Sequence, residues 1–130
     1  MEKEFIPYEQ ALALKELGFD EPCFANYNIE GILQPIMLIE KQNTNSYFAS
    51  GGYFEEVCTA PTFSQAFRWF RDKGFYTDIF VDDNKSFGYM RSKFIKEGRV
   101  DSPIQRGYSS YEEAQLECLK ELINKYEARR

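Results

Sequence analysis

Three residues whose side chains could bind a protein or an anionic ligand are near one another in the sequence, around residue 70. Arg68, Trp69 and Arg71 fall on a predicted helix, off the apolar stripe of that helix. Tryptophan and arginine dominate binding hot spots, and the planar guanidinium of arginine matches carboxylate and phosphate groups. The alternative is that Trp69 packs against a neighbouring loop while the arginines pair locally, because tryptophan is usually well buried.

A second group of candidate binding residues alternates along a predicted strand. Tyr89, Arg91 and Lys93 follow Phe87 at a period of two, so all four side chains share one face of the strand. Such a face can stack bases on its aromatic rings and hold phosphates with its cations. The competing interpretation is that these aromatic residues belong to the core, as they do in most strands.

The residue types that most often perform catalysis are missing or isolated. The chain has no histidine, which excludes serine–histidine and cysteine–histidine catalysis and histidine-based metal sites. Neither a GxxxxGK[ST] nor a GxGxxG motif is present. The triplet Asp83-Asn84-Lys85 matches a short nuclease pattern, but a turn explains it better. The sequence therefore predicts no catalytic residue, no metal site and no cofactor, and it favours a protein that is not an enzyme.

The cysteines indicate structural thiols. Cys23, Cys58 and Cys118 are odd in number and widely spaced, and no CxxC pair exists. This argues against a disulfide framework, a zinc ribbon and a thioredoxin-type motif. Each cysteine has apolar neighbours, so we expect three small buried side chains.

Charge is distributed unevenly along this acidic, aromatic-rich chain. The formal net charge is −5, and residues 1–67 carry 10 acidic against 3 basic residues. Residues 68–106 carry 9 basic against 6 acidic residues, so only this part can present a positive face. The overall field disfavours binding to duplex nucleic acid. No apolar stretch approaches the roughly 20 residues that span a bilayer, and no signal-peptide pattern begins the chain, so a cytoplasmic protein is expected.

Caps and apolar spacing predict the first two helices. One covers about residues 7–17 and ends at Gly18, where a left-handed glycine is typical of a Schellman stop. Another follows the capping box from Thr62 to Gln65 and ends at Gly74. Its apolar stripe consists of Phe63, Ala66, Phe67 and Phe70.

Four strands are predicted from β-branched and aromatic content and from turn residues. Residues 23–28 and 33–40 form an early pair, separated by a turn. Residues 75–81 and 86–95 form a hairpin around the turn at 82–85. Strands joined by short turns pair antiparallel.

The remaining segments are a third helix and two less regular stretches. Residues 47–54, which contain Gly51-Gly52, are either a further short strand or an aromatic-rich loop. Residues 99–109 contain Pro103 and Gly107 and are predicted to be a loop. A second capping box, from Ser110 to Glu113, begins a helix that continues to about residue 126.

These elements predict an α+β fold. The order helix, strands, helix, hairpin, helix favours one antiparallel sheet of about four to five strands with three helices packed on one face. At 130 residues the chain is predicted to form a single two-layer domain over its whole length.

Three blocks of sequence resemble a known group of proteins. They are LKELGFDEPCFANY (residues 14–27), APTFSQAFRWFRDKGFY (60–76) and YSSYEEAQLECLKELI (108–123). In order and spacing they resemble small uncharacterised proteins of gut Bacteroidales and of their prophages and mobile elements. The resemblance implies a bacterial or phage setting and a role in the interaction between a phage and its host. It assigns no functional residue.

Three functions remain open from the sequence. The first is a non-enzymatic binding protein, such as a phage-borne accessory factor that acts on a host protein. Its basis is the aromatic content, 12 Phe, 9 Tyr and one Trp, without a catalytic constellation. The alternatives are a binder of a small anionic ligand or nucleotide that uses the basic middle third, and a single-stranded nucleic-acid binder.

Overall fold

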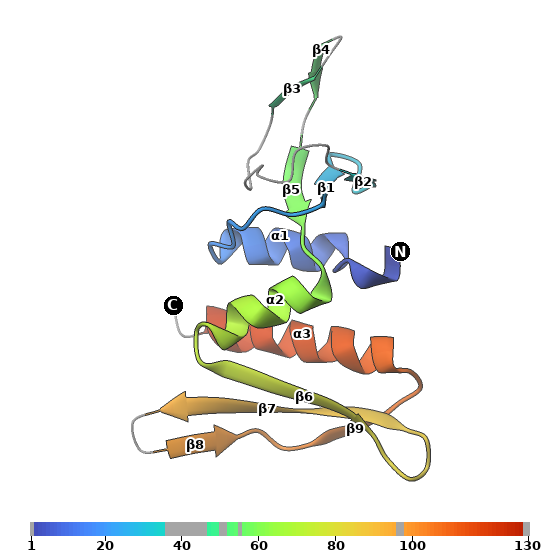
Figure 1. Cartoon of the computed structure of the whole chain (residues 1–130), viewed down its shortest axis with the longest axis vertical. Coiled ribbons are helices and arrows are strands. Elements are labelled where there is room, and N and C mark those ends of the chain that lie inside the picture. Colours follow the sequence, from blue (N-terminus) through green and yellow to red (C-terminus); the bar gives the residue numbers. More distant parts are fainter. Residues whose placement is uncertain (1, 36–46, 50–51, 55, 96–97, 129–130) are drawn as a thin grey trace. The chain divides into compact units, whose positions relative to one another are not determined.

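The computed structural model of the chain describes residues 2–35, 47–49, 52–54, 56–95 and 98–128. In these residues it contains three α-helices and nine β-strands, and the paired strands are antiparallel (Figure 1). The predicted α+β class is confirmed. The strands are divided between a three-stranded sheet, a four-stranded sheet and a separate pair, where the sequence predicted one sheet.

The chain groups into two compact units by its internal contacts. The first unit comprises Met1–Ser64 and the second comprises Gln65–Arg130. The three-stranded sheet belongs to the first unit and the four-stranded sheet to the second.

The first helix, α1 (Tyr8–Glu16), ends as the sequence predicts. Gly18 has a φ of +103°, the left-handed conformation that residues with a Cβ rarely adopt. Its N–H donates to the carbonyl of Lys15 at 3.1 Å, and the N–H of Phe19 donates to the carbonyl of Leu14 at 2.9 Å. These two bonds form a Schellman motif and satisfy carbonyls that the helix itself leaves free.

The sheet of the first unit has β1 (Ala25–Asn28) between β2 (Leu33–Pro35) and β5 (Glu56–Ala60). Helix α1 packs against β5. The hydroxyl of Tyr27 donates to the backbone carbonyl of Ile6 at 2.6 Å, so the central strand is also fixed to the segment before α1. The turn predicted between β1 and β2 is present.

Two further short strands lie between β2 and β5 in the chain. Strand β3 (Tyr47–Ala49) pairs with β4 (Gly52–Phe54), so the open choice between strand and loop is decided for these six residues. Gly51 and residues 36–40 of the predicted second strand lie outside the described residues.

Helix α2 (Phe63–Arg71) carries the predicted apolar stripe. Gly74, with a φ of +92°, follows the helix, and its N–H donates to the carbonyl of Arg71 at 2.9 Å. The end of the helix is therefore confirmed at the predicted glycine. All members of the stripe are buried: Phe63, Ala66, Phe67 and Phe70.

The hairpin of the second unit has the predicted strands and turn. Strand β6 (Phe75–Val81) pairs along its whole length with β7 (Phe87–Ile95). In the turn, one carboxylate oxygen of Asp82 accepts from the N–H groups of Asn84 and Ser86, at 2.9 and 3.0 Å. A carboxylate in this position replaces backbone partners and stabilises the turn.

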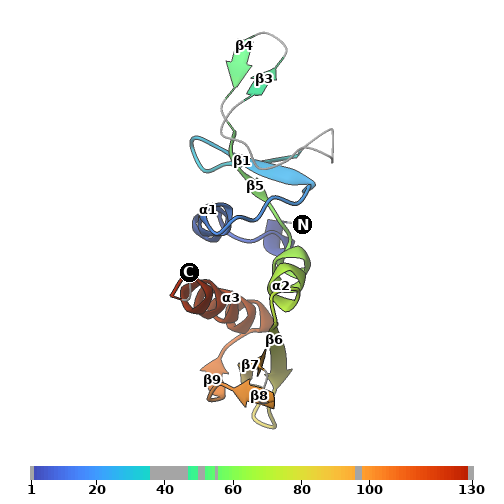
Figure 2. The same ribbon diagram turned by 90° about the vertical axis from the view of Figure 1, so that its left-hand side faces the viewer.

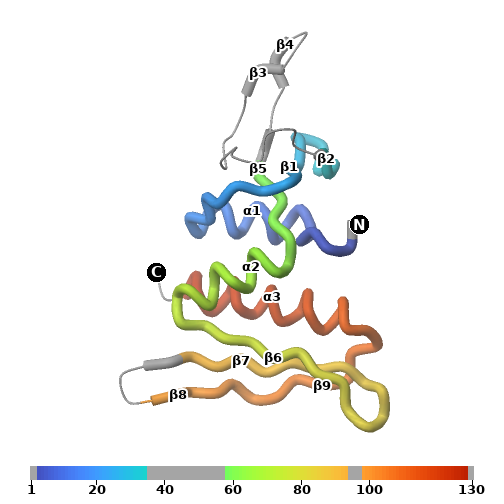
Figure 3. Tube along the Cα trace, in the orientation of Figure 1, coloured from blue at the N-terminus to red at the C-terminus, as the bar shows by residue number. Residues whose placement is uncertain are grey.

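The prediction of a loop at residues 99–109 is wrong. The segment forms β8 (Gly98–Asp101) and β9 (Gln105–Tyr108), and both strands pair with β7 (Figure 3). Pro103 falls in the break between the two strands, where no ladder hydrogen bond requires its missing N–H. Gly107 lies inside β9 with a φ of +94°.

Helix α3 (Tyr111–Glu127) covers one face of this four-stranded sheet (Figure 2). Its predicted cap is confirmed, because the hydroxyl of Ser110 accepts from the N–H of Glu113 at 3.1 Å. Tyr111, at the start of the helix, is exposed. The helix buries five side chains, Ala114, Cys118, Leu119, Leu122 and Ile123, and Tyr126 is half-buried.

Candidate functional site: a basic cleft between the sheet and the end of helix α3

The tryptophan of the first candidate group is a core residue. Trp69 is only 7% exposed, and its ring contacts Phe70 and Tyr126 at centroid distances of 5.1 and 5.5 Å. Arg68 and Arg71 are exposed on the same helix. The three residues therefore do not form one exposed surface.

The second candidate group lies on the face of β7 that α3 covers. The hydroxyl of Tyr89 donates to a carboxylate oxygen of Glu121, and Nη2 of Arg91 lies 3.1 Å from the other carboxylate oxygen. Tyr89 also stacks on Tyr108, with centroids 5.9 Å apart. Tyr89 and Arg91 do share one face of β7, as predicted. At these two residues the face is covered by α3 and is not open to solvent.

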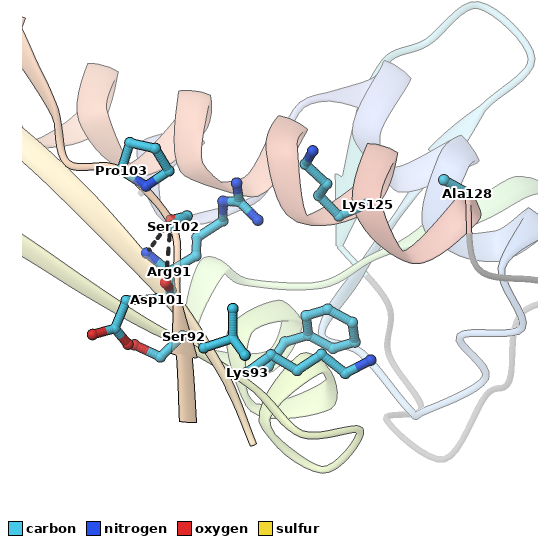
Figure 4. Close-up of a pocket in the computed structure, with 10 residues that line it drawn as sticks. Arg91, Ser92, Lys93, Asp101, Ser102, Pro103, Lys125 and Ala128 are labelled. Atoms are coloured by element: carbon cyan, nitrogen blue, oxygen red, sulfur yellow. Dashed lines mark hydrogen bonds between the residues drawn. The ribbon is translucent and has the colours of Figure 1, made fainter. Parts of the chain in front are cut away.

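Beyond Tyr89 the covered face opens into a cleft of about 400 Å³. The cleft lies between strands β6, β7 and β8 and the C-terminal end of α3 (Figure 4). Arg91 and Lys93 line it, whereas Arg68, Trp69, Arg71 and Tyr89 do not. The other lining residues are Phe75, Ser92, Val100, Asp101, Ser102, Pro103, Lys125 and Ala128.

Ser102 fixes one wall of the cleft. Its hydroxyl accepts from the N–H of Arg91 at 3.0 Å and donates to the carbonyl of Arg91 at 3.1 Å. Its own N–H donates to the same carbonyl at 2.7 Å. These three bonds lie at the break between β8 and β9. They fix the position of the segment that contains Pro103 relative to the backbone of Arg91.

Two cations of the cleft are left without ion pairs. Arg91 is neutralised by Glu121, and Asp101 is neutralised by Arg99, whose Nε and Nη2 lie 2.6 and 2.9 Å from its carboxylate oxygens. The hydrogen bond from Arg99 lowers the pKa of Asp101. Within the described part of the chain, neither Lys93 nor Lys125 forms an ion pair. The ammonium of Lys93 lies 4.9 Å from the centre of the Phe75 ring.

All three cysteines are buried thiols, as predicted. Cys118 lies on α3, and burial raises the pKa of its thiol to about 12. A thiol with such a pKa is protonated at neutral pH and is a poor nucleophile. In the residues that the structure describes, no group of three acidic or cysteine side chains gathers as metal ligands would.

Of the ten residues that line the cleft, the sequence predicts only Arg91 and Lys93 as site residues. Lys125 and Val100 are among the others, because the sequence places Lys125 in the last helix and Val100 in a predicted loop. The packing of α3 on the sheet brings them together with Arg91 and Lys93. An available signal was the lysine in the last turn of α3.

Among the helices described, none is both long and apolar enough to cross a membrane. Comparisons of the chain with models of protein families, with curated proteins and with solved structures found no match.

Proposed function

We propose that this protein is a non-catalytic binding protein whose cleft takes a small anionic ligand. The observation that carries the proposal is the pair of unneutralised lysines, Lys93 on β7 and Lys125 on α3, which line one concave site. Ligand sites are typically clefts with a few convergent polar groups on apolar walls. A positive cleft in a chain of net charge −5 concentrates anions locally.

The partial negative charge at the C-terminal end of α3 opposes the binding of an anion only weakly. The last carbonyls of a helix carry a partial negative charge, and Ala128 at this end lines the cleft. Lys125 lies in the same last turn and offsets that charge. Lys93 adds a full positive charge from the sheet, so the balance favours a ligand with a negative group.

Inorganic phosphate is the probe for the first test. Titration of the full chain is expected to shift the backbone amide NMR signals of Val100 and Ser102 saturably at roughly millimolar phosphate. The double variant Lys93→Gln/Lys125→Gln should bind at least about tenfold more weakly, because two charge-assisted contacts are lost.

Lys120→Gln is the matched control. Lys120 lies on the same helix and is exposed, but it pairs with Glu117 at 3.0 Å and does not line the cleft. Its replacement should leave the titration unchanged. Equal phosphate binding by the double variant and the unmodified chain would show that the anion site lies elsewhere.

A protein partner is the second candidate function, and exposed apolar side chains of the first unit favour it. Ile29 and Ile32 are 64% and 52% exposed and lie in the turn between β1 and β2. Apolar side chains that project from one turn suit a protein contact. An accessory factor that binds a host protein is the role implied by the resemblance to mobile-element proteins.

Crosslinking in a bacterial lysate tests this second candidate. The unmodified chain is expected to form a discrete crosslinked species that Ile29→Ser/Ile32→Ser loses. Val81→Ser is the control, because Val81 is a similarly exposed apolar residue of the second unit. If both variants capture the same species in the same amount, the turn is not the contact.

A further inference from the structure

We infer that the ligand of the cleft is an amphipathic organic anion, with its negative charge attracted by Lys93 and Lys125 and an apolar body in the cleft. The inference rests on the proposed function and names the chemical class of its ligand. It follows from which groups of the cleft wall remain available to a ligand.

Two polar side chains of the wall are already engaged within the protein. The hydroxyl of Ser102 is used by the backbone of Arg91, and the carboxylate of Asp101 by Arg99. A ligand with several hydroxyl groups or a base edge, such as a nucleotide, would leave its own polar groups unpaired against these residues.

The cleft also offers a ligand apolar surface and two ammonium ions. Phe75, Val100, Pro103 and Ala128 supply the apolar part of the wall. Val100 is 55% exposed although it belongs to a strand, so a ligand can bury it. Burial of such surface strengthens binding in proportion to its area.

The arrangement of cation and ring also suits an aromatic body. The ammonium of Lys93 lies near the Phe75 ring, and it can contact the face of a second ring in the same way. The volume of about 400 Å³ is at the lower end for small-molecule pockets, which suits a body of one or two fused rings. The head can be a carboxylate or a phosphate, since a lysine ammonium binds either as a point charge.

Calorimetry with four probes tests the inference on the full chain. They are 2-naphthoate, 2-naphthyl phosphate, acetate and 2-naphthalenemethanol. At least one of the two naphthyl anions should bind about tenfold or more tightly than both acetate and the neutral alcohol, with a negative heat-capacity change from apolar burial. Which naphthyl anion binds more tightly identifies the head group.

Two variants assign that binding to the cleft. Val100→Ser should weaken the naphthyl anion several-fold and weaken phosphate much less, because it removes apolar surface and keeps both lysines. Lys125→Gln should weaken both, and Lys120→Gln should weaken neither. Val100 and Lys125 are exposed, so neither variant is expected to prevent folding.

The outcomes separate the two proposals. If inorganic phosphate or acetate binds as tightly as the naphthyl anions, the cleft is a simple anion site and only the inference fails. If the neutral alcohol binds as tightly as the naphthyl anions, the inference also fails, because the charge then contributes nothing. If no anion binds, the proposed function fails as well.

Discussion

Replacement of Phe70 by alanine is expected to lower the free energy of unfolding of the second unit by about 3–5 kcal/mol. Phe70 is fully buried, and its ring meets Trp69, Phe75 and Tyr126 at centroid distances of 5.1, 6.5 and 6.0 Å. The edge-to-face geometry of these pairs adds to the loss of buried area and to the cost of the cavity. Chemical denaturation followed by fluorescence measures the effect, because Trp69 is the single tryptophan of the chain and lies in this cluster.

Tyr76→Ala is the control for the loss of a ring. Tyr76 lies one residue after Phe75 in β6, but it is 40% exposed. We expect its replacement to cost less than about 1 kcal/mol, as surface substitutions usually do. Equal costs for Phe70→Ala and Tyr76→Ala would contradict the assignment of the cluster as the core of this unit.

The helices could be predicted because their signals are local. The stop at Gly18 depends on Leu14 and Phe19, and the start of α3 depends on Ser110 and Glu113. Each set lies within six residues of sequence. Caps and a left-handed glycine impose the same hydrogen bonds whatever surrounds the helix, so tertiary packing has little opportunity to override them.

Strands β8 and β9 could not be predicted in the same way. Every residue of β8 is exposed, so no alternation of buried and exposed side chains marks it. In its pairing with β7, Asp101 lies opposite Ser92. This strand therefore forms because a partner strand is available, and its own sequence does not determine it. Pro103 and Gly107 suggested a loop, but one lies in the break and the other has the positive φ that a glycine permits.

The candidate site was predicted only where one element carries it. Arg91 and Lys93 share a face by the period of a strand, and that part of the prediction is confirmed. Trp69 lies off the Phe63, Phe67 and Phe70 stripe, yet it is buried because Tyr126 of α3 reaches it. Lys125 joins the cleft by the same packing. Contacts of α3 with elements distant in sequence decide both outcomes: its contact with α2 buries Trp69, and its packing on the sheet brings Lys125 to the cleft.

The second unit is expected to lose stability steeply in alkaline solution. Burial, together with the hydrogen bond to Glu121, raises the pKa of Tyr89 well above its ordinary value of 10.0. Burial raises the pKa of Cys118 from 9.0 to about 12. In the unfolded chain both groups lose their protons at lower pH, so the folded state binds more protons and unfolding becomes more favourable as the pH rises.

The sign and the pH window follow from these values. The stabilisation from both groups is fully present below pH 9, and the part due to Cys118 is lost between about pH 9 and 12. The part due to Tyr89 begins to be lost above pH 10. Each group lowers the free energy of unfolding by up to about 1.4 kcal/mol per pH unit within its window.

Two variants separate these contributions when denaturation is measured from pH 8 to 11. Tyr89→Phe keeps the ring stacked on Tyr108 but has no hydroxyl to ionise, so it should be less stable at pH 8 and show a shallower decline above pH 10. Cys118→Ala should flatten the decline that begins at pH 9. Both side chains are neutral while they keep their protons. When either one loses its proton, a negative charge forms in a buried place near the carboxylate of Glu121. Identical slopes in both variants and the unmodified chain would mean that neither group is buried as described.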